Sequence, residues 1–388
     1  MHGTQRPVIV AAPDSFKGSC SAAEAAAAML DGAREVWGER AEYLAIPLAD
    51  GGEGTLDALT AAWGVTPREA IAQDALGRPR AARYGIDADG ATAIIEAAEA
   101  NGLPWVSDQP LQPLTADSFG VGQLALEALS RGAGEILLTV GGSATSDGGT
   151  GMLRALGVRF LDALGAEVRE GAAGLAEIST IDTSRLDPRA LAATWRVAVD
   201  VTSPLCGLAG AAAVYGPQKG AGSAEIAVID AGLERLATLL ANRNGVPTAS
   251  YTERPGFGAA GGIPLAAVAL LGAETIAGGD LISRALDLPR RLASASLVLT
   301  GEGRLDSQSL GGKVVDLVAR TRPAGVPLVV IAGTVELTAA ECRAAGITAA
   351  FSIAPGPSDL AELTARAEDR VRETAAHAVA LAGDLRSA

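Results

Sequence analysis

Apolar runs of strand length alternate with helix-length amphipathic segments at both ends of the chain. The expected strands are residues 7–12, 43–48, 297–300, 327–331 and 349–353. The first expected helix runs from about residue 22 to Trp37. It is preceded by Ser21 with Glu24 three positions later, the signature of a capping box. This alternation of strand and helix is typical of a parallel sheet covered by helices on both faces.

The middle of the chain follows a different pattern. Three apolar stretches separated by turn-like segments predict an antiparallel meander at 66–73, 79–86 and 92–97. Beyond a proline-rich loop we expect helices at 121–129, around Met152, at 224–242 and at 261–271, and strands at 136–140 and 195–199. We therefore expect an α/β protein. A doubly wound parallel-sheet domain would be built from both termini (1–65 and 293–388), with a second α/β domain inserted as residues 66–292.

Length and charge narrow the class of protein. A chain of 388 residues is long enough for two domains. Its net charge of −14 disfavours a nucleic-acid partner, because an acidic surface repels phosphate backbones. No apolar run reaches the roughly 18–20 residues of a membrane span, and the first residues lack the layout of a signal peptide. We expect a cytoplasmic protein with no membrane or nucleic-acid partner. A homodimer is an oligomeric state that the sequence leaves open.

Histidine and lysine are scarce. The two histidines, His2 and His377, lie near the two ends of the chain, so a histidine base, a histidine-rich metal site or a Ser-His-Asp triad is not expected. Only three of the 31 basic residues are lysine: Lys17, Lys219 and Lys313. Each lies beside glycine in a segment expected to be a flexible loop, and a lysine ammonium group suits a phosphate oxygen. Chance retention of solvated side chains is the alternative.

Six glycine-rich segments carry acids, hydroxyls or lysine, and four of them directly follow an expected strand. In open α/β sheets, ligands bind beyond the carboxyl ends of strands. The first segment leads into a helix, where Lys17 and free N–H groups favour a phosphate or a carboxylate. The second holds Asp50 and Glu53 among glycines, with acids at a helix start as the alternative. The six segments are residues 12–19, 48–55, 141–151, 200–207, 216–220 and 300–313.

The later segments add a phosphate nest and further carboxylates. Residues 141–151 hold five glycines and four hydroxyls, a composition suited to a nest of backbone N–H donors for phosphate. Asp200 ends an apolar strand, a position that holds Mg²⁺ in nucleotide enzymes and otherwise caps a turn. Glu302 and Asp306 can both reach a metal or a hydroxyl, with Lys313 nearby. Carboxylates, lysines and glycine nests without histidine suit phosphoryl transfer, which needs charge neutralisation and positioning.

Two common nucleotide-binding motifs do not fit. Residues 120–125 match G-x-G-x-x-A, but no convincing strand precedes them. Lys313 follows Gly312 without the other residues of a Walker A loop. A nucleotide would therefore be bound without either motif.

Six motifs, taken in order, resemble those of the bacterial glycerate kinase type-1 family. They are Ala12-Pro-Asp-Ser-Phe-Lys-Gly-Ser19, Pro47-Leu-Ala-Asp-Gly-Gly-Glu-Gly-Thr55, Gly141-Gly-Ser-Ala-Thr145, Asp147-Gly-Gly149, Gly216-Pro-Gln-Lys-Gly-Ala221 and Thr300-Gly-Glu-Gly-Arg304. The resemblance implies ATP-dependent phosphorylation of D-glycerate, giving 2-phosphoglycerate in many members. It also implies a Rossmann-like domain, a discontinuous partner domain and an active-site cleft between them.

The candidate site residues fall into four groups, with D-glycerate, ATP and Mg²⁺ as partners. The expected catalytic residues are Lys17, Asp200 and Asp306. The expected substrate-binding residues are Asp14, Ser15, Asp50, Glu53 and Arg304. The expected nucleotide- and phosphate-binding residues are Gly141, Gly142, Ser143, Thr145, Lys219 and Lys313. The expected metal ligands are Asp200 and Glu302. The division of roles among the carboxylates stays open, as does 3-phosphoglycerate as the product.

The chain departs from the family pattern at three positions, and two other functions compete. Ser146 and Ser203 stand where asparagine is usual, and Gly311 stands where histidine is common, which bears on substrate selectivity. A NAD-dependent 2-hydroxy-acid oxidoreductase would need a true G-x-G-x-x-G after the first strand and usually a histidine base. A non-enzymatic two-lobed ligand-binding protein would form no ADP with D-glycerate.

Overall fold

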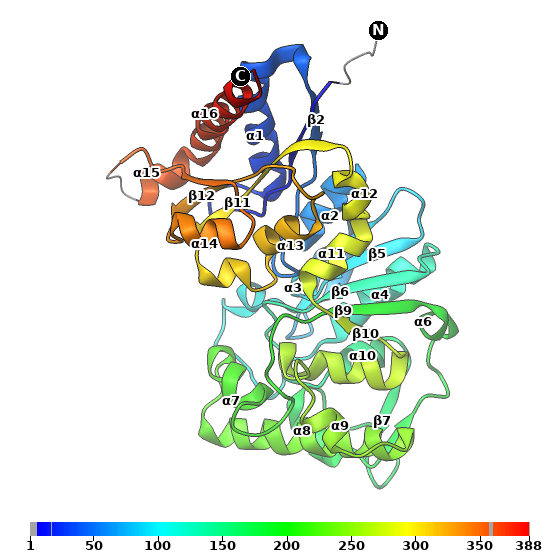
Figure 1. Cartoon of the computed structure of the whole chain (residues 1–388). Helices are drawn as coiled ribbons and strands as arrows, with labels where there is room; N and C mark the ends of the chain where they lie inside the picture. Colours follow the sequence, from blue (N-terminus) through cyan, green and yellow to red (C-terminus); the bar gives the residue numbers. More distant parts are fainter. Residues whose placement is uncertain (1–5, 17, 357–359, 388) are drawn as a thin grey trace. The chain divides into compact units, whose positions relative to one another are not determined.

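The computed structural model describes residues 6–16, 18–356 and 360–387, and these form two compact units (Figure 1). Unit 1 comprises the described residues of Met1–Asp50, Asp57–Gly64 and Gly279–Ala388. Unit 2 comprises Gly51–Leu56 and Val65–Gly278. The sequence-based boundary placed residues 279–292 in the inserted domain, whereas here they pack in unit 1. There Trp63 Nε1 donates a hydrogen bond to the Ala285 carbonyl (3.4 Å).

Unit 1 is built on a parallel sheet of five strands in the order β13-β12-β11-β1-β2. The strands are β1 (Val8–Ala11), β2 (Glu42–Ala45), β11 (Ala295–Leu305), β12 (Leu328–Val335) and β13 (Ala349–Ser352). The chain order reverses between β1 and β11, since β2 lies on one side of β1 and the later strands on the other. In open sheets this reversal marks where ligands bind.

Helices cover the unit 1 sheet. α1 (Ala22–Trp37) and α16 (Ala367–Ser387) pack against each other and share one core with alternate residues of β1, β11 and β12. In Figure 1, α13 and α14 lie on the opposite side of β11 and β12 from α1 and α16. The capping box is confirmed, because Ser21 Oγ accepts from Glu24 N (3.2 Å) while Glu24 Oε2 accepts from Ser21 N (2.8 Å). The remaining helical segments are α2 (Thr55–Trp63), η1 (Gly38–Arg40), α11 (Gly278–Leu286), α12 (Leu288–Leu292), η6 (Ser307–Leu310), α13 (Val314–Thr321), α14 (Ala339–Ala344) and α15 (Leu360–Ala365).

Unit 2 contains a mixed sheet of six strands in the order β10-β9-β6-β5-β4-β3. The strands are β3 (Arg68–Gln73), β4 (Pro79–Ile86), β5 (Thr92–Glu96), β6 (Glu135–Thr139), β9 (Thr194–Ala198) and β10 (Glu274–Ile276). The expected meander is confirmed, because β3, β4 and β5 pair antiparallel. β5, β6, β9 and β10 pair in parallel. Together the two sheets make an α/β protein dominated by parallel strands.

The helices of unit 2 enclose one large apolar core around the sheet, which includes Tyr84, Phe160, Trp195 and Phe257. A two-stranded hairpin, β7 (Arg159–Leu161) with β8 (Thr180–Asp182), was not expected from the sequence. The helical segments are α3 (Ala97–Asn101), η2 (Leu103–Val106), α4 (Phe119–Ser130), α5 (Thr150–Ala155), η3 (Ala172–Glu177), α6 (Pro188–Ala192), α7 (Ala211–Tyr215), η4 (Pro217–Lys219), α8 (Ser223–Asn244), α9 (Ala249–Thr252), η5 (Ala259–Gly262) and α10 (Ile263–Leu271).

One local expectation is wrong. The sequence predicted a strand at 297–300 followed by a glycine-rich loop, but β11 continues to Leu305. Its last residues pair with β12, with Glu302 opposite Ala332 and Arg304 opposite Thr334. Gly301 is needed because a side chain there would strike the Ile331 carbonyl of β12. The glycines therefore permit close strand pairing rather than a loop.

Candidate functional site

The segment after β1 is fixed to β11, at the reversal of chain order in unit 1. Asp14 N donates to the Gly301 carbonyl (2.8 Å), and Thr300 Oγ1 donates to the Ala12 carbonyl (2.7 Å). The Asp14 side chain is buried, and its Oδ1 accepts a hydrogen bond from Ser15 N (2.6 Å). Asp14 and Ser15 thus lie at the carboxyl end of the sheet, as the sequence predicted. Lys17 lies outside the described residues.

The Glu302 side chain combines a buried carboxylate oxygen with a raised pKa. Its Oε1 is buried and has no hydrogen-bond partner among the described residues. Burial raises the pKa of this carboxyl above its ordinary value, while a hydrogen bond with Ser309 and the Lys313 ammonium group oppose the rise. The charges of Asp306 and Asp50 add to it. The structure therefore brings three of the predicted carboxylates and one predicted lysine into the same electrostatic environment.

Asp306 and Arg304 are engaged by their neighbours. Asp306 caps η6, because its Oδ1 accepts from Gln308 N (2.8 Å). Arg304 is exposed and pairs with Glu336 (2.6 Å), and its Nε lies 3.5 Å from Asp306 Oδ2. Lys313 is half-buried at the start of α13. A substrate would have to compete with Glu336 for the Arg304 guanidinium group.

The glycine-rich segment Gly51–Leu56 belongs to unit 2 and already holds a carboxylate of the same unit. Glu96, at the end of β5, accepts hydrogen bonds from Gly54 N and Leu56 N (3.2 Å each). Its charge therefore occupies the helix start that would otherwise attract an anion. Glu53 is exposed beside it. Glu96 was not predicted, and its position at the end of an expected strand was the signal that could have found it.

The segment after β6 is a closed loop with a polar interior. Gly141 and Gly142 are exposed, whereas Ser143 and Thr145 are buried. Asn101 Nδ2 donates to Thr145 Oγ1 (3.1 Å), and the Leu103 N–H donates to the Gly142 carbonyl (3.0 Å). The loop thus presents two glycines outward and keeps its hydroxyls inside.

Asp147 fixes the far end of this loop. Its Oδ2 accepts from Ser118 N (2.9 Å), Ser118 Oγ (2.7 Å) and Gly151 N (3.0 Å), and its Oδ1 accepts from Gly149 N (3.0 Å). The buried carboxylate therefore satisfies the N–H groups at the start of α5, which the sequence analysis had assigned to a phosphate nest. The outer part of the loop, from Gly141 to Thr145, remains as the candidate phosphate site.

The sequence predicted a flexible loop around Lys219, and this is wrong. The alternative interpretation of Lys219 as a solvated side chain is wrong as well. It ends the short helix η4, and its side chain is only 2% exposed. Its Nζ donates to the Thr145 carbonyl (2.5 Å) and lies 3.5 Å from Ser143 Oγ. Burial lowers its pKa from 10.5 to about 8, against the attraction of Asp147. The structure thus joins three of the predicted phosphate-binding residues.

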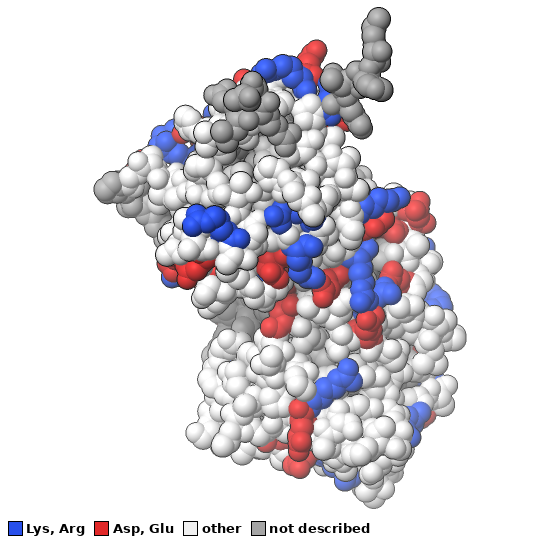
Figure 2. All heavy atoms as spheres, viewed as in Figure 1, with Lys and Arg blue, Asp and Glu red and all other residues white. Residues whose placement is uncertain are grey.

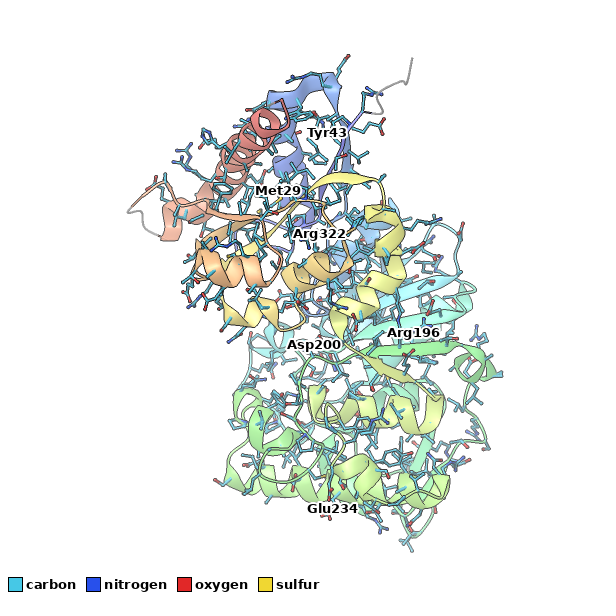
Figure 3. All side chains as sticks on the ribbon, viewed as in Figure 1. Met29, Tyr43, Arg196, Asp200, Glu234 and Arg322 are labelled. Carbon is cyan, nitrogen blue, oxygen red and sulfur yellow. The ribbon has the colours of Figure 1, made fainter. Side chains whose placement is uncertain are left out.

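Asp200 is exposed just beyond the end of β9 (Figure 3). Its Oδ1 accepts a hydrogen bond from Gly278 N (2.8 Å). A side chain at Gly51 would contact Asp200 Oδ2 and the backbone of Gly278, so three segments of unit 2 meet at this carboxylate. In the described part of the chain, no three His, Cys, Asp or Glu side chains are grouped to hold a metal.

Comparison with known proteins identifies the family. The sequence profile of the Glycerate kinase family matches residues 9–383. A glycerate 2-kinase of Escherichia coli K12 is 42% identical over 364 residues, which cover 94% of each chain. A glycerate kinase of Halalkalibacterium halodurans is 40% identical over 368 residues, or 95% of this chain and 96% of that one. The chain belongs to the glycerate kinase family.

A solved structure agrees with this assignment to the glycerate kinase family. A crystal structure from Salmonella typhimurium LT2, described as a candidate glycerate kinase 2, is 40% identical to this chain and matches it with a TM-score of 0.88. The match covers 99% of this chain and 100% of that one. The chain is therefore an enzyme, a phosphotransferase with an alcohol group as acceptor. Among the residues that the structure describes, no helix has the length and apolarity to cross a membrane.

The family assignment agrees with the rejection of the dinucleotide motif. Gly120 and Gly122 lie in the first turn of α4, where a side chain would strike the backbone of Gln73 in β3 or of Met152 in α5. These glycines therefore serve the packing of α4. The nicotinamide-dependent and non-enzymatic alternatives have no support in the structure of this family member.

Proposed function

We propose that the chain transfers the γ-phosphoryl group of ATP to the 2-hydroxyl of D-glycerate. The glycerate oxygen forms a bond to the γ-phosphorus, the bond to the β–γ bridging oxygen breaks, and the hydroxyl proton passes to a carboxylate. The products are 2-phosphoglycerate and ADP. The family assignment and the E. coli glycerate 2-kinase relative support the substrate and the position. The observation that carries the chemistry is Glu302 Oε1, which is buried near other acids and has no hydrogen-bond partner in the described part of the chain.

The carboxylates around Glu302 fit Mg²⁺. This ion takes oxygen ligands and is held by one or two carboxylates together with water and substrate phosphates, so it needs no group of three protein acids. Glu302 Oε1 is buried without a hydrogen-bond partner among the described residues, and Asp50 and Asp306 act on the same carboxyl. Glu302 would hold the ion. Asp200, in unit 2, is separately proposed as a metal ligand. When bound, Mg²⁺ supplies positive charge to the transferred phosphoryl group.

The chain's own residues supply binding and proton transfer. The Gly141–Thr145 segment would receive ATP phosphates, because Gly141 and Gly142 are exposed and glycine-rich segments form nests of backbone N–H donors. Asp306 and Asp200 are the proposed bases, and each has one oxygen engaged by a backbone N–H, which holds the carboxylate in place. Lys17 is proposed to contact the transferred phosphoryl group.

The test is an ADP-release assay on the purified chain with ATP, MgCl₂ and D-glycerate. We expect turnover that requires D-glycerate and is abolished by EDTA, with L-glycerate and D-lactate as acceptor controls. Phosphorus–proton NMR of the product should show phosphate on carbon 2. Absence of Mg²⁺-dependent ADP formation with D-glycerate contradicts the function, and phosphate on carbon 3 contradicts the assigned position.

A further inference from the structure

A buried cation, Lys219, contacts the candidate phosphate loop from inside unit 2. Lys219 ends η4, and Gly220 follows it with φ +89°, a conformation that glycine adopts readily. This turn directs the lysine side chain into unit 2, where only 2% of the residue is exposed. The Nζ atom donates to the Thr145 carbonyl at 2.5 Å, with Ser143 Oγ at 3.5 Å. The ammonium group is therefore bonded to the loop itself.

The Lys219 ammonium group has no carboxylate partner at ion-pair distance among the described residues. Asp147 is the charged group that acts on it electrostatically. Both Asp147 oxygens are engaged, however, by Ser118, Gly149 and Gly151. Burying a charge without a direct counter-ion is costly, and an apolar side chain of similar length would avoid that cost. A structural role alone does not explain the lysine.

The bond from Lys219 completes the fixation of Thr145. The hydroxyl of Thr145 accepts from Asn101 Nδ2 (3.1 Å), and its carbonyl accepts from Lys219 Nζ. The Ala144 N–H donates to the Asn101 carbonyl (2.8 Å). Gly261 approaches the Thr145 carbonyl so closely that no side chain fits there. The hydroxyl and the carbonyl of Thr145 thus each have a side-chain donor.

We propose that Lys219 is a positioning residue for phosphoryl transfer, because its buried ammonium group holds the Gly141–Thr145 loop in the shape that receives the ATP phosphates. This inference rests on the proposed function. Lys219 acts through the carbonyl of Thr145 and the hydroxyl of Ser143 and does not itself contact the transferred group. Its positive charge behind the loop also favours a polyanion at the outer glycines.

Protonation provides a check on this role. Burial brings the pKa of Lys219 to about 8, and Asp147 is the charged group that opposes this fall. Above that pH the amine is neutral, so its bond to Thr145 weakens and its charge behind the loop is lost. ATP binding should therefore weaken between pH 7 and 9.5, while D-glycerate binding should not.

The main experiment compares the parent with Lys219→Met, which keeps the length and removes the charge and donors. We expect KM for ATP to rise about 10- to 100-fold, the effect of losing a hydrogen bond to a charged group, with KM for D-glycerate within twofold. Lys219→Gln keeps an N–H donor and should recover part of the loss. The matched control is Arg235→Met, because Arg235 Nε also donates to a backbone carbonyl in unit 2, that of Ile178 (3.1 Å). This control should leave both KM values unchanged.

Hydrogen exchange in the absence of nucleotide tests the positioning without activity. The amides of residues 141–145 should exchange faster in Lys219→Met than in the parent or in Arg235→Met. A parent that is inactive with D-glycerate contradicts the proposed function, and the exchange result still decides whether Lys219 holds the loop. An active parent with unchanged KM for ATP and unchanged exchange in Lys219→Met overturns the positioning role.

The pH dependence of KM for ATP in the parent tests the positioning role even if Lys219→Met does not fold. A KM for ATP that stays constant from pH 7 to 9.5 overturns the inference. A rise in the parent that persists in Lys219→Met or Lys219→Gln also overturns it. A rise confined to the parent supports it.

Discussion

Glu302 in strand β11 of unit 1 and Lys219 in η4 of unit 2 are both ionisable residues with a buried polar atom, yet the two atoms have different partners. Burial raises the pKa of the glutamate and lowers that of the lysine, since it disfavours the charged form of each. Glu302 keeps one oxygen without a hydrogen-bond partner among the described residues. Lys219, in contrast, is bonded to a backbone carbonyl.

The difference suggests different roles for the two residues. Glu302 is available to a ligand, whereas Lys219 holds a loop of the protein in place. An unpaired buried oxygen costs stability, and a bound ion or substrate can offset that cost. A buried ammonium group bonded to the Thr145 carbonyl has already found its partner inside the protein. On the face shown in Figure 2, charged side chains are denser in the upper and middle parts of the view than at its lower end.

The largest expected effect is the loss of Glu302. Glu302→Gln removes the carboxylate proposed to hold Mg²⁺ but keeps the shape, so kcat should fall by about 10²- to 10⁴-fold. The melting temperature should stay equal or rise, because the raised pKa shows that the charged form is disfavoured in the folded state. Steady-state kinetics and thermal melts measure both.

Glu336→Gln is the matched control for this variant. Glu336 belongs to the same part of unit 1 but lies near the surface, paired with Arg304 at 2.6 Å. A pair at such an exposed position contributes little to stability. Its kcat should remain within twofold of the parent. Equal losses in both variants would mean that the position of Glu302 is not special.

The second largest expected effect is that of Asp147→Asn, which should lower the free energy of unfolding. The carboxylate accepts four hydrogen bonds, and an amide would turn an N–H group towards donors that already point at it. We expect the free energy of unfolding to fall by about 3–5 kcal/mol in a denaturant titration. An unchanged midpoint would show that the loop is held by Asn101 and Lys219 without Asp147.

The third prediction follows from the lowered pKa of Lys219 in the folded protein. Between pH 8 and 10.5 the unfolded chain keeps the lysine proton and the folded chain does not, so this group makes the protein more stable as pH rises. The difference in free energy of unfolding between parent and Lys219→Met should shift in favour of the parent by on the order of 3 kcal/mol from pH 7.5 to 10.5. Affinity for ATP should fall over the same range. Stability and affinity that fall together would contradict the assignment.

The sequence predicted helices and strands correctly where local signals, such as caps and turns, agree with the tertiary structure. The capping box at Ser21 and Glu24 placed the start of α1, and the turn-like segments of the meander placed β3 and β4. The end of β11 was missed because glycine and charged residues disfavour a strand, whereas pairing with β12 imposes one. That pairing is between segments far apart in the chain and leaves no local trace.

The sequence predicted which residues belong to the candidate site, but not the burial of these residues or the hydrogen bonds between them. Acids just after expected strands drew attention to Asp14, Glu302 and Asp200, because ligands bind beyond the carboxyl ends of strands in open α/β sheets. Asp14 and Asp200 do follow a strand, whereas Glu302 lies inside β11. The sequence Gly-Pro-Gln-Lys-Gly around Lys219 is typical of an exposed turn, so the burial of Lys219 could not be read from it. The role of Asp147 depends on Ser118, which lies 29 positions earlier in the chain. Neither residue type nor spacing encodes that contact.

The smallest expected effect tests whether every unpaired oxygen marks a ligand. Ser146 is 1% exposed, and its Oγ has no hydrogen-bond partner among the described residues, as is true of Glu302 Oε1. Unlike the glutamate, it carries no charge that a cation could neutralise. Ser146→Ala should therefore raise the free energy of unfolding by up to about 1 kcal/mol, because it removes a buried hydroxyl without a partner. KM for ATP should stay within twofold. Denaturant titration and steady-state kinetics on the same preparation measure both. A fivefold rise in KM would place the Ser146 hydroxyl with Glu302 as a ligand contact, and the two unpaired oxygens would then have the same explanation.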